Sequence, residues 1–114
     1  MAAGQVRLAF EALRHVEASA FTGAYQNLGA VTAHPIRIFK ITNNTAKDVT
    51  VSFDGGTTDH EYVPAGSFVL IDATANRSWD CAFALGANVQ VAIKSATASG
   101  VAGTFVYMSC YYGI

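Results

Sequence analysis

The sequence predicts an all-β fold: a single-domain antiparallel β-sandwich, jelly-roll-like, with roughly seven to eight short strands. Three observations predict it. Apolar and polar residues alternate with a period of two from residue 36 to the end, as in strands with one wet face. Gly, Asn, Asp and Pro interrupt these runs about every ten residues. The length of 114 residues fits one domain, residues 1–114.

The segment from Gln5 to Val16 fits two patterns. Helical spacing relates one set of apolar residues, Val6, Phe10, Leu13 and Val16. Alternation relates another set, Val6, Leu8, Phe10 and Ala12. We favour a strand or an extended N-terminal arm over residues 1–16, because the β-rich remainder offers a sheet edge to join. Residues 5–13 would then add a strand to a neighbour's sheet, with Arg7, Glu11 and Arg14 in polar contacts, or form an ordinary edge strand of their own domain.

The next two strands have clear signals. Ile36 to Thr42 is rich in β-branched residues and is followed by Asn43-Asn44, which favours a turn. Val49 to Phe53 alternates apolar side chains with hydroxyls, as expected for a strand with one face toward water. Asp54-Gly55-Gly56 then predicts a tight turn, because glycine supplies the positive φ that such turns need.

The C-terminal half continues in the same way. His60 to Val63 and Ser67 to Asp72 are predicted strands joined by a turn at Pro64-Ala65-Gly66. Residues 81–85 and 89–93 are a predicted hairpin around Gly86-Ala87-Asn88. The last strand, Thr104 to Tyr112, leaves neither face polar and is therefore central or pressed against a neighbour.

Motifs for catalysis, cofactors or metals are missing. The acidic stretch from Asp54 to Glu61 lacks the alternating oxygen ligands and the final glutamate of a calcium loop, so a hairpin tip explains it. His15, His34 and His60 lie in separate segments without metal-ligand spacing. The sequence has no G-x-S-x-G and no phosphate-binding glycine loop. We therefore predict no enzyme, no cofactor and no metal site, and we expect Cys81 and Cys110 to be buried free thiols.

Charge and hydropathy limit the partners. Seven basic and eight acidic residues give a net charge of -1, which argues against nucleic acid. The N-terminus lacks the pattern of a signal peptide, and no apolar run is long enough to span a bilayer. We therefore expect that the protein does not associate with a membrane. Charged residues make up only 13%, which is low for a free monomer. Partner subunits, including copies of the chain itself, are expected to cover part of the surface.

Aromatic and exposed apolar side chains are the remaining functional candidates. Trp79 lies in a polar loop and is either an exposed anchor or a lid over the end of the sandwich, whereas Tyr111 and Tyr112 suit either an interface or the core. The candidate interface residues are Val6, Leu8, Phe10, Leu13, Trp79, Tyr111 and Tyr112. A carbohydrate-binding module is a more distant alternative, in which Trp79, Tyr25 or Tyr62 would be sugar platforms.

Five segments together resemble small virion structural proteins of tailed bacteriophages: FTGAYQNLG (21–29), HPIR (34–37), ITNNT (41–45), VSFDG (51–55) and TDHEYVPAGSF (58–68). The resemblance runs from about Arg7 to Tyr112. It implies a capsid decoration, or cement, protein that binds the major capsid protein and stabilises the head. A head-to-tail connector, collar or tail-fibre attachment component remains open. Either role implies a homo-oligomer that is made in the host bacterial cytoplasm and located in the virion. The resemblance does not identify functional residues.

Overall fold

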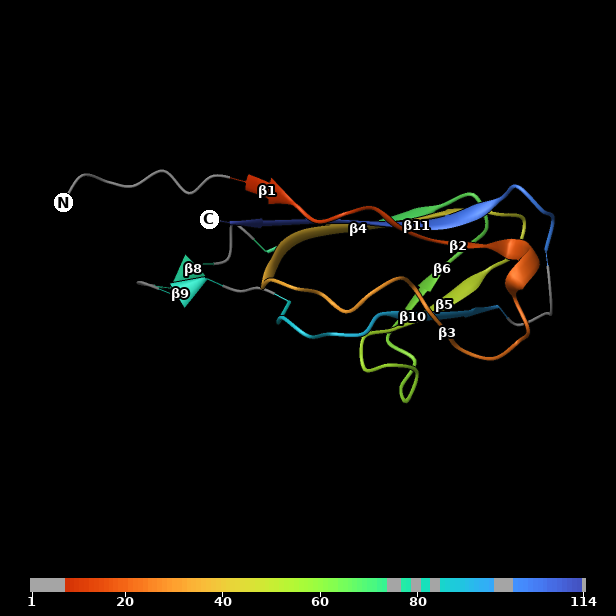
Figure 1. Cartoon of the computed structure of the whole chain (residues 1–114), viewed down its shortest axis with the longest axis horizontal. Coiled ribbons are helices and arrows are strands. Elements are labelled where there is room, and N and C mark those ends of the chain that lie inside the picture. The colour runs from red at the N-terminus through yellow and green to blue at the C-terminus, as the bar shows by residue number, and fades with distance from the viewer. Residues whose placement is uncertain (1–7, 74–76, 79–80, 83–84, 96–99, 114) are drawn as a thin grey trace.

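The structure is a computed structural model that describes residues 8–73, 77–78, 81–82, 85–95 and 100–113. Its regular structure is almost entirely antiparallel β, which confirms the predicted fold class. One short 3₁₀ turn, Ala18–Ala20, follows the second strand. Figure 1 shows two layers of strands, one above the other, as in a β-sandwich.

Each layer is one sheet. The first sheet contains β1 (Leu8–Phe10), β2 (Arg14–Glu17), β4 (Ile36–Asn44), β7 (Phe68–Asp72) and β11 (Phe105–Gly113). The second sheet contains β3 (Gln26–Asn27), β5 (Val49–Ser52), β6 (Glu61–Val63) and β10 (Ala92–Ser95). A separate small hairpin pairs β8 (Arg77–Ser78) with β9 (Cys81–Ala82).

The strand pairings are nested. β2 pairs with β11, β3 with β10, β4 with β7 and β5 with β6. Contacts of β11 with β4 and of β10 with β5 complete the two sheets, in the orders β2-β11-β4-β7 and β3-β10-β5-β6. This is the eight-stranded double Greek key of a jelly roll. β1 and the hairpin β8–β9 are additions to those eight strands.

The N-terminal segment forms strands rather than a helix over residues 8–17. β2 lies beside Phe105–Met108 and β1 lies further along the same strand, beside Tyr111–Gly113. Both therefore pair with the chain's own β11, which is central in its sheet, as its two apolar faces predicted.

The prediction that residues 81–85 and 89–93 form a hairpin is wrong. Residues 81–82 pair with β8, and β10 instead lies between β3 and β5. Leu85 makes one isolated bridge to Ile36, and Asn88 has a positive φ of 61°. Nested pairing in a jelly roll joins strands far apart in sequence, so it overrides the local hairpin signal.

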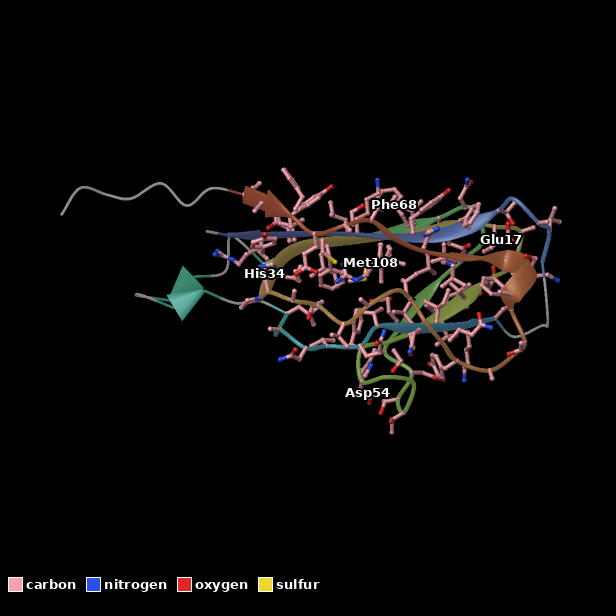
Figure 2. The ribbon with its side chains drawn as sticks, viewed as in Figure 1. Glu17, His34, Asp54, Phe68 and Met108 are labelled. Atoms are coloured by element: carbon pink, nitrogen blue, oxygen red, sulfur yellow. The ribbon has the colours of Figure 1, made fainter. Side chains whose placement is uncertain are left out.

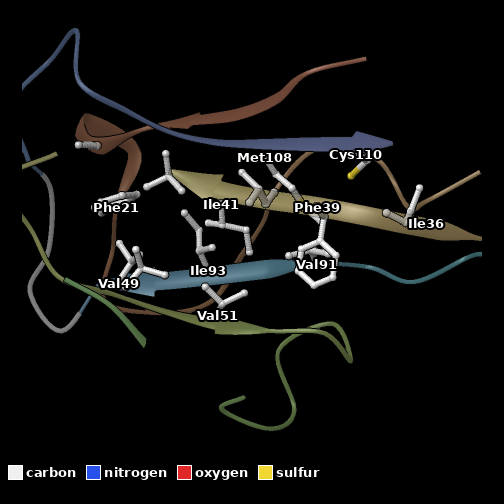
Figure 3. Close-up of a cluster of buried hydrophobic side chains, with 14 residues drawn as sticks. Phe21, Ile36, Phe39, Ile41, Val49, Val51, Val91, Ile93, Met108 and Cys110 are labelled. Atoms are coloured by element: carbon white, nitrogen blue, oxygen red, sulfur yellow. The ribbon is translucent and has the colours of Figure 1, made fainter. Parts of the chain in front are cut away.

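The core lies between the two sheets, as Figure 3 shows. The first sheet contributes inward side chains from β4 and β11, and the second contributes inward side chains from β5 and from the chain around β10. These residues are Ile36, Phe39, Ile41, Val106, Met108 and Cys110 on one side, and Val49, Val51, Val91 and Ile93 on the other. Cys110 is a buried free thiol, as expected, whereas the side chain of Cys81 lies outside the described residues.

Candidate functional site

The outer face of the first sheet carries many apolar and aromatic side chains. Cross-strand partners in a sheet share a face, so the register places Phe10, Tyr111 and Ile38 together, and Tyr107 beside His15. On β7, Phe68 and Leu70 point the same way, opposite Thr42 and Lys40. Figure 2 shows Phe68 on the outside of this sheet and Met108 between the sheets. The apolar face consists of Leu8, Phe10, His15, Ile38, Phe68, Leu70, Phe105, Tyr107 and Tyr111.

Several of these side chains are largely open to solvent. Phe10 is 67% exposed, Phe68 62% and Leu70 54%. A sheet with one wet face normally alternates apolar and polar residues, with the polar ones outward. Lys40, Thr42 and Ser109 lie on the same face, between the two β7 residues and the rings of β11. Large apolar side chains that gather on one exposed face are typical of an interaction site.

Ring contacts hold the apolar face in place. Phe10 meets Tyr111 edge-on at 5.0 Å between ring centroids, and His15 stacks on Tyr107 at 6.5 Å. The ammonium of Lys40 lies 5.1 Å from the centre of the Phe68 ring. Ordered rings lose little conformational freedom when a partner docks, because their rotamers are already restricted.

A cavity of about 550 Å³ continues the apolar face past Phe10. It lies between the segment joining β1 to β2 and residues 29–34, and Leu13 and Val31 line its exposed rim. Tyr112 lines it as well and stacks on His34 at 3.7 Å between ring centroids. Because Tyr112 pairs with Ala9 and not with Phe10, it lies on the opposite side of β11 from Tyr111.

An ion pair forms the wall of this cavity. Glu11 accepts a hydrogen bond of 2.6 Å from Arg14, and both side chains are more than nine-tenths buried. The other carboxylate oxygen of Glu11 accepts the backbone N–H groups of Ala33 and His34 and lies 2.9 Å from Nδ1 of His34. Arg14 also donates to the carbonyl of Ala30, at 2.9 Å. The pair therefore fastens residues 30–34 to the chain that enters β2.

Burial and hydrogen bonding set the protonation of these groups. Burial acts to raise the pKa of Glu11, but the hydrogen bonds from Arg14 and His34 outweigh it and hold this pKa below the ordinary value. Burial raises the pKa of the Cys110 thiol, although Arg14 opposes that shift. Cys110 is therefore protonated at neutral pH and is a poor nucleophile.

The outer face of the second sheet is polar by contrast. The register places Tyr62, Thr50 and Lys94 in one row across β6, β5 and β10. Asp59, in the loop before β6, accepts a hydrogen bond from the hydroxyl of Tyr25 and lies 3.3 Å from the ammonium of Lys94. Burial and the Asp59 carboxylate raise the pKa of Tyr25 to about 12, so its hydroxyl remains a donor. The polar face consists of Tyr25, Asp48, Thr50, Asp59, Tyr62 and Lys94.

The acidic hairpin is held by its own hydrogen bonds. Asp54 accepts from the Ser52 hydroxyl and from the backbone N–H groups of Thr57 and Thr58, and the Ser52 and Thr58 bonds hold its pKa well below the ordinary value. Within the described residues, no group of three His, Cys, Asp or Glu side chains is placed to hold a metal ion. The carboxylate of Asp54 acts as a turn-forming group here.

The interface residues predicted from the sequence divide into three groups. Leu8, Phe10 and Tyr111 lie on the apolar face, whereas Leu13 and Tyr112 line the cavity beside it. Val6 and Trp79 lie outside the described residues. Phe68 and Leu70 were not predicted as interface residues. Their spacing of two in a predicted strand did indicate that they share one face of the sheet.

Neither known protein families nor curated proteins include a significant match to this sequence. Within the described part of the chain, no helix is long and apolar enough to cross a membrane. Function has to be inferred from the two faces and the cavity.

Proposed function

We propose that this chain is a structural protein of a bacteriophage virion, a capsid decoration protein that binds the major capsid protein through its apolar face. The observation that carries the proposal is the set of largely exposed rings and aliphatic side chains on the outer face of the first sheet, including Phe10, Phe68 and Leu70. Buried cores of protein interfaces are rich in such side chains and poor in charge. The resemblance of the sequence to small phage virion proteins supplies the identity of the partner.

The jelly roll suits this role because it is rigid. Its core is filled from both sheets, and the ion pair of Glu11 with Arg14 fixes the chain at one end of the apolar face. A preformed surface binds without a large ordering cost. A shell repeats each contact many times, so contacts that are weak singly become effectively permanent when the chain also forms homo-oligomers.

The cavity gives the apolar face a place for an anchor. Its rim is apolar at Leu13 and Val31, and the polar groups of its wall, Glu11 and Arg14, are bonded to the chain itself. A partner side chain entering it would gain apolar contact without leaving those groups unpaired. We expect an aliphatic or aromatic side chain of the capsid protein to occupy it.

Co-sedimentation with empty phage capsids tests the proposal. We expect the chain to sediment with the shells in stoichiometric amounts and to raise their resistance to heat. The double variant Phe68→Thr, Leu70→Thr should lose at least about tenfold in affinity, while its own unfolding free energy changes by less than about 1 kcal/mol because both side chains are exposed.

Val101→Thr is the matched control, because Val101 is 65% exposed and lies off the apolar face, before β11. It should bind as the unchanged chain does. A chain that forms a stable ring in light scattering and ignores capsids contradicts the decoration role and favours a connector, collar or tail component. Binding that survives the double variant contradicts the assignment of the apolar face.

A further inference from the structure

A groove on the opposite side of the sandwich combines an exposed aromatic ring with hydrogen-bonding groups. It measures about 330 Å³ and is lined by Thr50, Asp59, His60, Glu61 and Tyr62. We propose that this groove binds a neutral pyranose sugar of a glycan, with Tyr62 as the stacking platform. The inference does not depend on the role of the apolar face.

Tyr62 has the exposure and the rigidity of a platform. The residue is 55% exposed, while its hydroxyl donates to Asp48 at 2.6 Å. The same carboxylate accepts the backbone N–H of Ala65 at 2.9 Å, so the acceptor is itself fixed. A ring held by its polar tip presents its apolar faces to solvent, and such a face matches the C–H side of a pyranose.

Donors and acceptors surround the ring. Nδ1 of His60 accepts the backbone N–H of Phe53 at 3.0 Å, which leaves the proton of the neutral imidazole on Nε2 as a donor. Asp59 supplies carboxylate acceptors, and Thr50 supplies a hydroxyl on the same face of the sheet as Tyr62. Sugar hydroxyls both donate and accept, so they need this mixture of groups around one apolar surface.

The groove is ordered before a ligand arrives. Tyr25 donates to Asp59, and Lys94 lies 4.7 Å from the centre of the Tyr25 ring. Gly56 has a φ of +107° and packs so closely on Tyr25 that an added Cβ would lie 2.9 Å from the Cβ of that residue. Preformed geometry lowers the entropic cost of binding, which matters most for a weak ligand such as one sugar unit.

Charge selects the class of sugar. Asp48, Asp59 and Glu61 place three carboxylates in or beside the groove, and the nearby ammonium of Lys94 is already paired with Asp59. Acidic sugars would meet like charge there, which disfavours uronic and sialic acids. Neutral hydroxyl-rich units face no such repulsion.

The test is binding of the full chain to immobilised sugars. We expect the biotinylated chain, displayed as a tetramer on streptavidin, to bind at least one of maltose, lactose and diacetylchitobiose, and to bind glucuronic acid and N-acetylneuraminic acid at least about tenfold more weakly. No binding to any neutral probe, or a preference for the acidic probes, overturns the proposal.

Variants locate the site. Tyr62→Ala should weaken binding at least about tenfold, whereas Tyr62→Phe keeps the ring and should stay within about threefold. Asp59→Asn should weaken binding without moving the thermal midpoint by more than a few degrees. Val101→Ala is the control, and it should match the unchanged chain. Equal binding by Tyr62→Ala overturns the assignment.

A second measurement does not depend on any variant folding. Titration of the unchanged chain with the bound sugar should shift the ring resonances of Tyr62 in nuclear magnetic resonance spectra and leave those of Phe68 in place. Shifts confined to the apolar face contradict the proposal. Failure of the chain to bind capsids would leave sugar binding unaffected, so the two proposals are tested separately.

Discussion

The two outer faces of the sandwich differ in what they expose, although each sheet has the same four-strand jelly-roll arrangement. The first exposes rings and aliphatic chains at Phe10, Phe68 and Leu70. The second exposes the ring of Tyr62 among hydroxyl, carboxylate and ammonium groups. The fold therefore fixes only the inward side chains, and the outward ones are left to determine which partners bind each side.

The ion pairs of the two faces show the same difference. Arg14 and Glu11 lie 2.6 Å apart with side chains only 8% and 6% exposed, whereas Lys94 and Asp59 lie 3.3 Å apart with side chains 33% and 59% exposed. A buried pair is costly to break because the remaining charge is left without a partner. An exposed pair contributes little, because water solvates either charge alone.

The largest effect in this comparison is expected from Arg14→Met. The substitution removes the charged partner of one Glu11 carboxylate oxygen and the hydrogen bonds to the carbonyls of Ala30 and Val31. The other carboxylate oxygen keeps the backbone N–H groups of Ala33 and His34. We expect the free energy of unfolding in urea to fall by about 3 kcal/mol, because the carboxylate loses its counter-ion but keeps its backbone hydrogen bonds. A loss below about 1 kcal/mol would contradict the structural role of the pair.

Glu11→Gln is expected to have the next largest effect, and its size should depend on pH. The folded pKa of Glu11 lies below the ordinary value of 4.5, so the ionised carboxylate stabilises the fold above that pH, and this contribution is lost as pH falls through the folded pKa. The variant should lose about 2 kcal/mol at pH 7. The difference from the unchanged chain should shrink as urea unfolding is repeated down to about pH 3. A difference that is constant with pH would show that Glu11 contributes no charge.

Local pattern was enough to predict the sandwich but not the surfaces. Alternation in residues 49–53 and the apolar run at 104–112 identified β5 and β11 because burial acts directly on those side chains. The pairing of β8 with β9 and the place of β10 were not predicted, because nested pairing depends on contacts distant in sequence.

The candidate sites were predicted only in part, for the same reason. Phe10 and Tyr111 are 101 positions apart and meet only because β1 pairs with the end of β11. Glu11 and Arg14 were expected to supply the polar contacts of an arm toward a neighbour. They are instead buried against residues 30–34, which no spacing in the sequence reveals.

A smaller effect is expected from glycine substitutions in the hairpin beside the polar face. Gly55 and Gly56 both have positive φ, at +80° and +107°, but only at Gly56 would a Cβ meet the side chain of Tyr25. Gly55→Ala should therefore cost about 1 kcal/mol from backbone strain, and Gly56→Ala about 2 kcal/mol because it adds the clash. Urea unfolding of the two variants side by side measures the difference. Equal losses would show that Tyr25 yields without cost.

The smallest effect is expected from Lys94→Ala, which breaks the exposed pair on the polar face. Asp59 keeps the hydrogen bond from the Tyr25 hydroxyl and remains open to water, so no carboxylate is left buried without a partner. The free energy of unfolding should change by less than about 0.5 kcal/mol, and 0.5 M salt should remove even that difference. A loss comparable to that of Arg14→Met would mean that charge pairs stabilise the polar face as they stabilise the cavity wall. The two faces would then differ only in their apolar side chains.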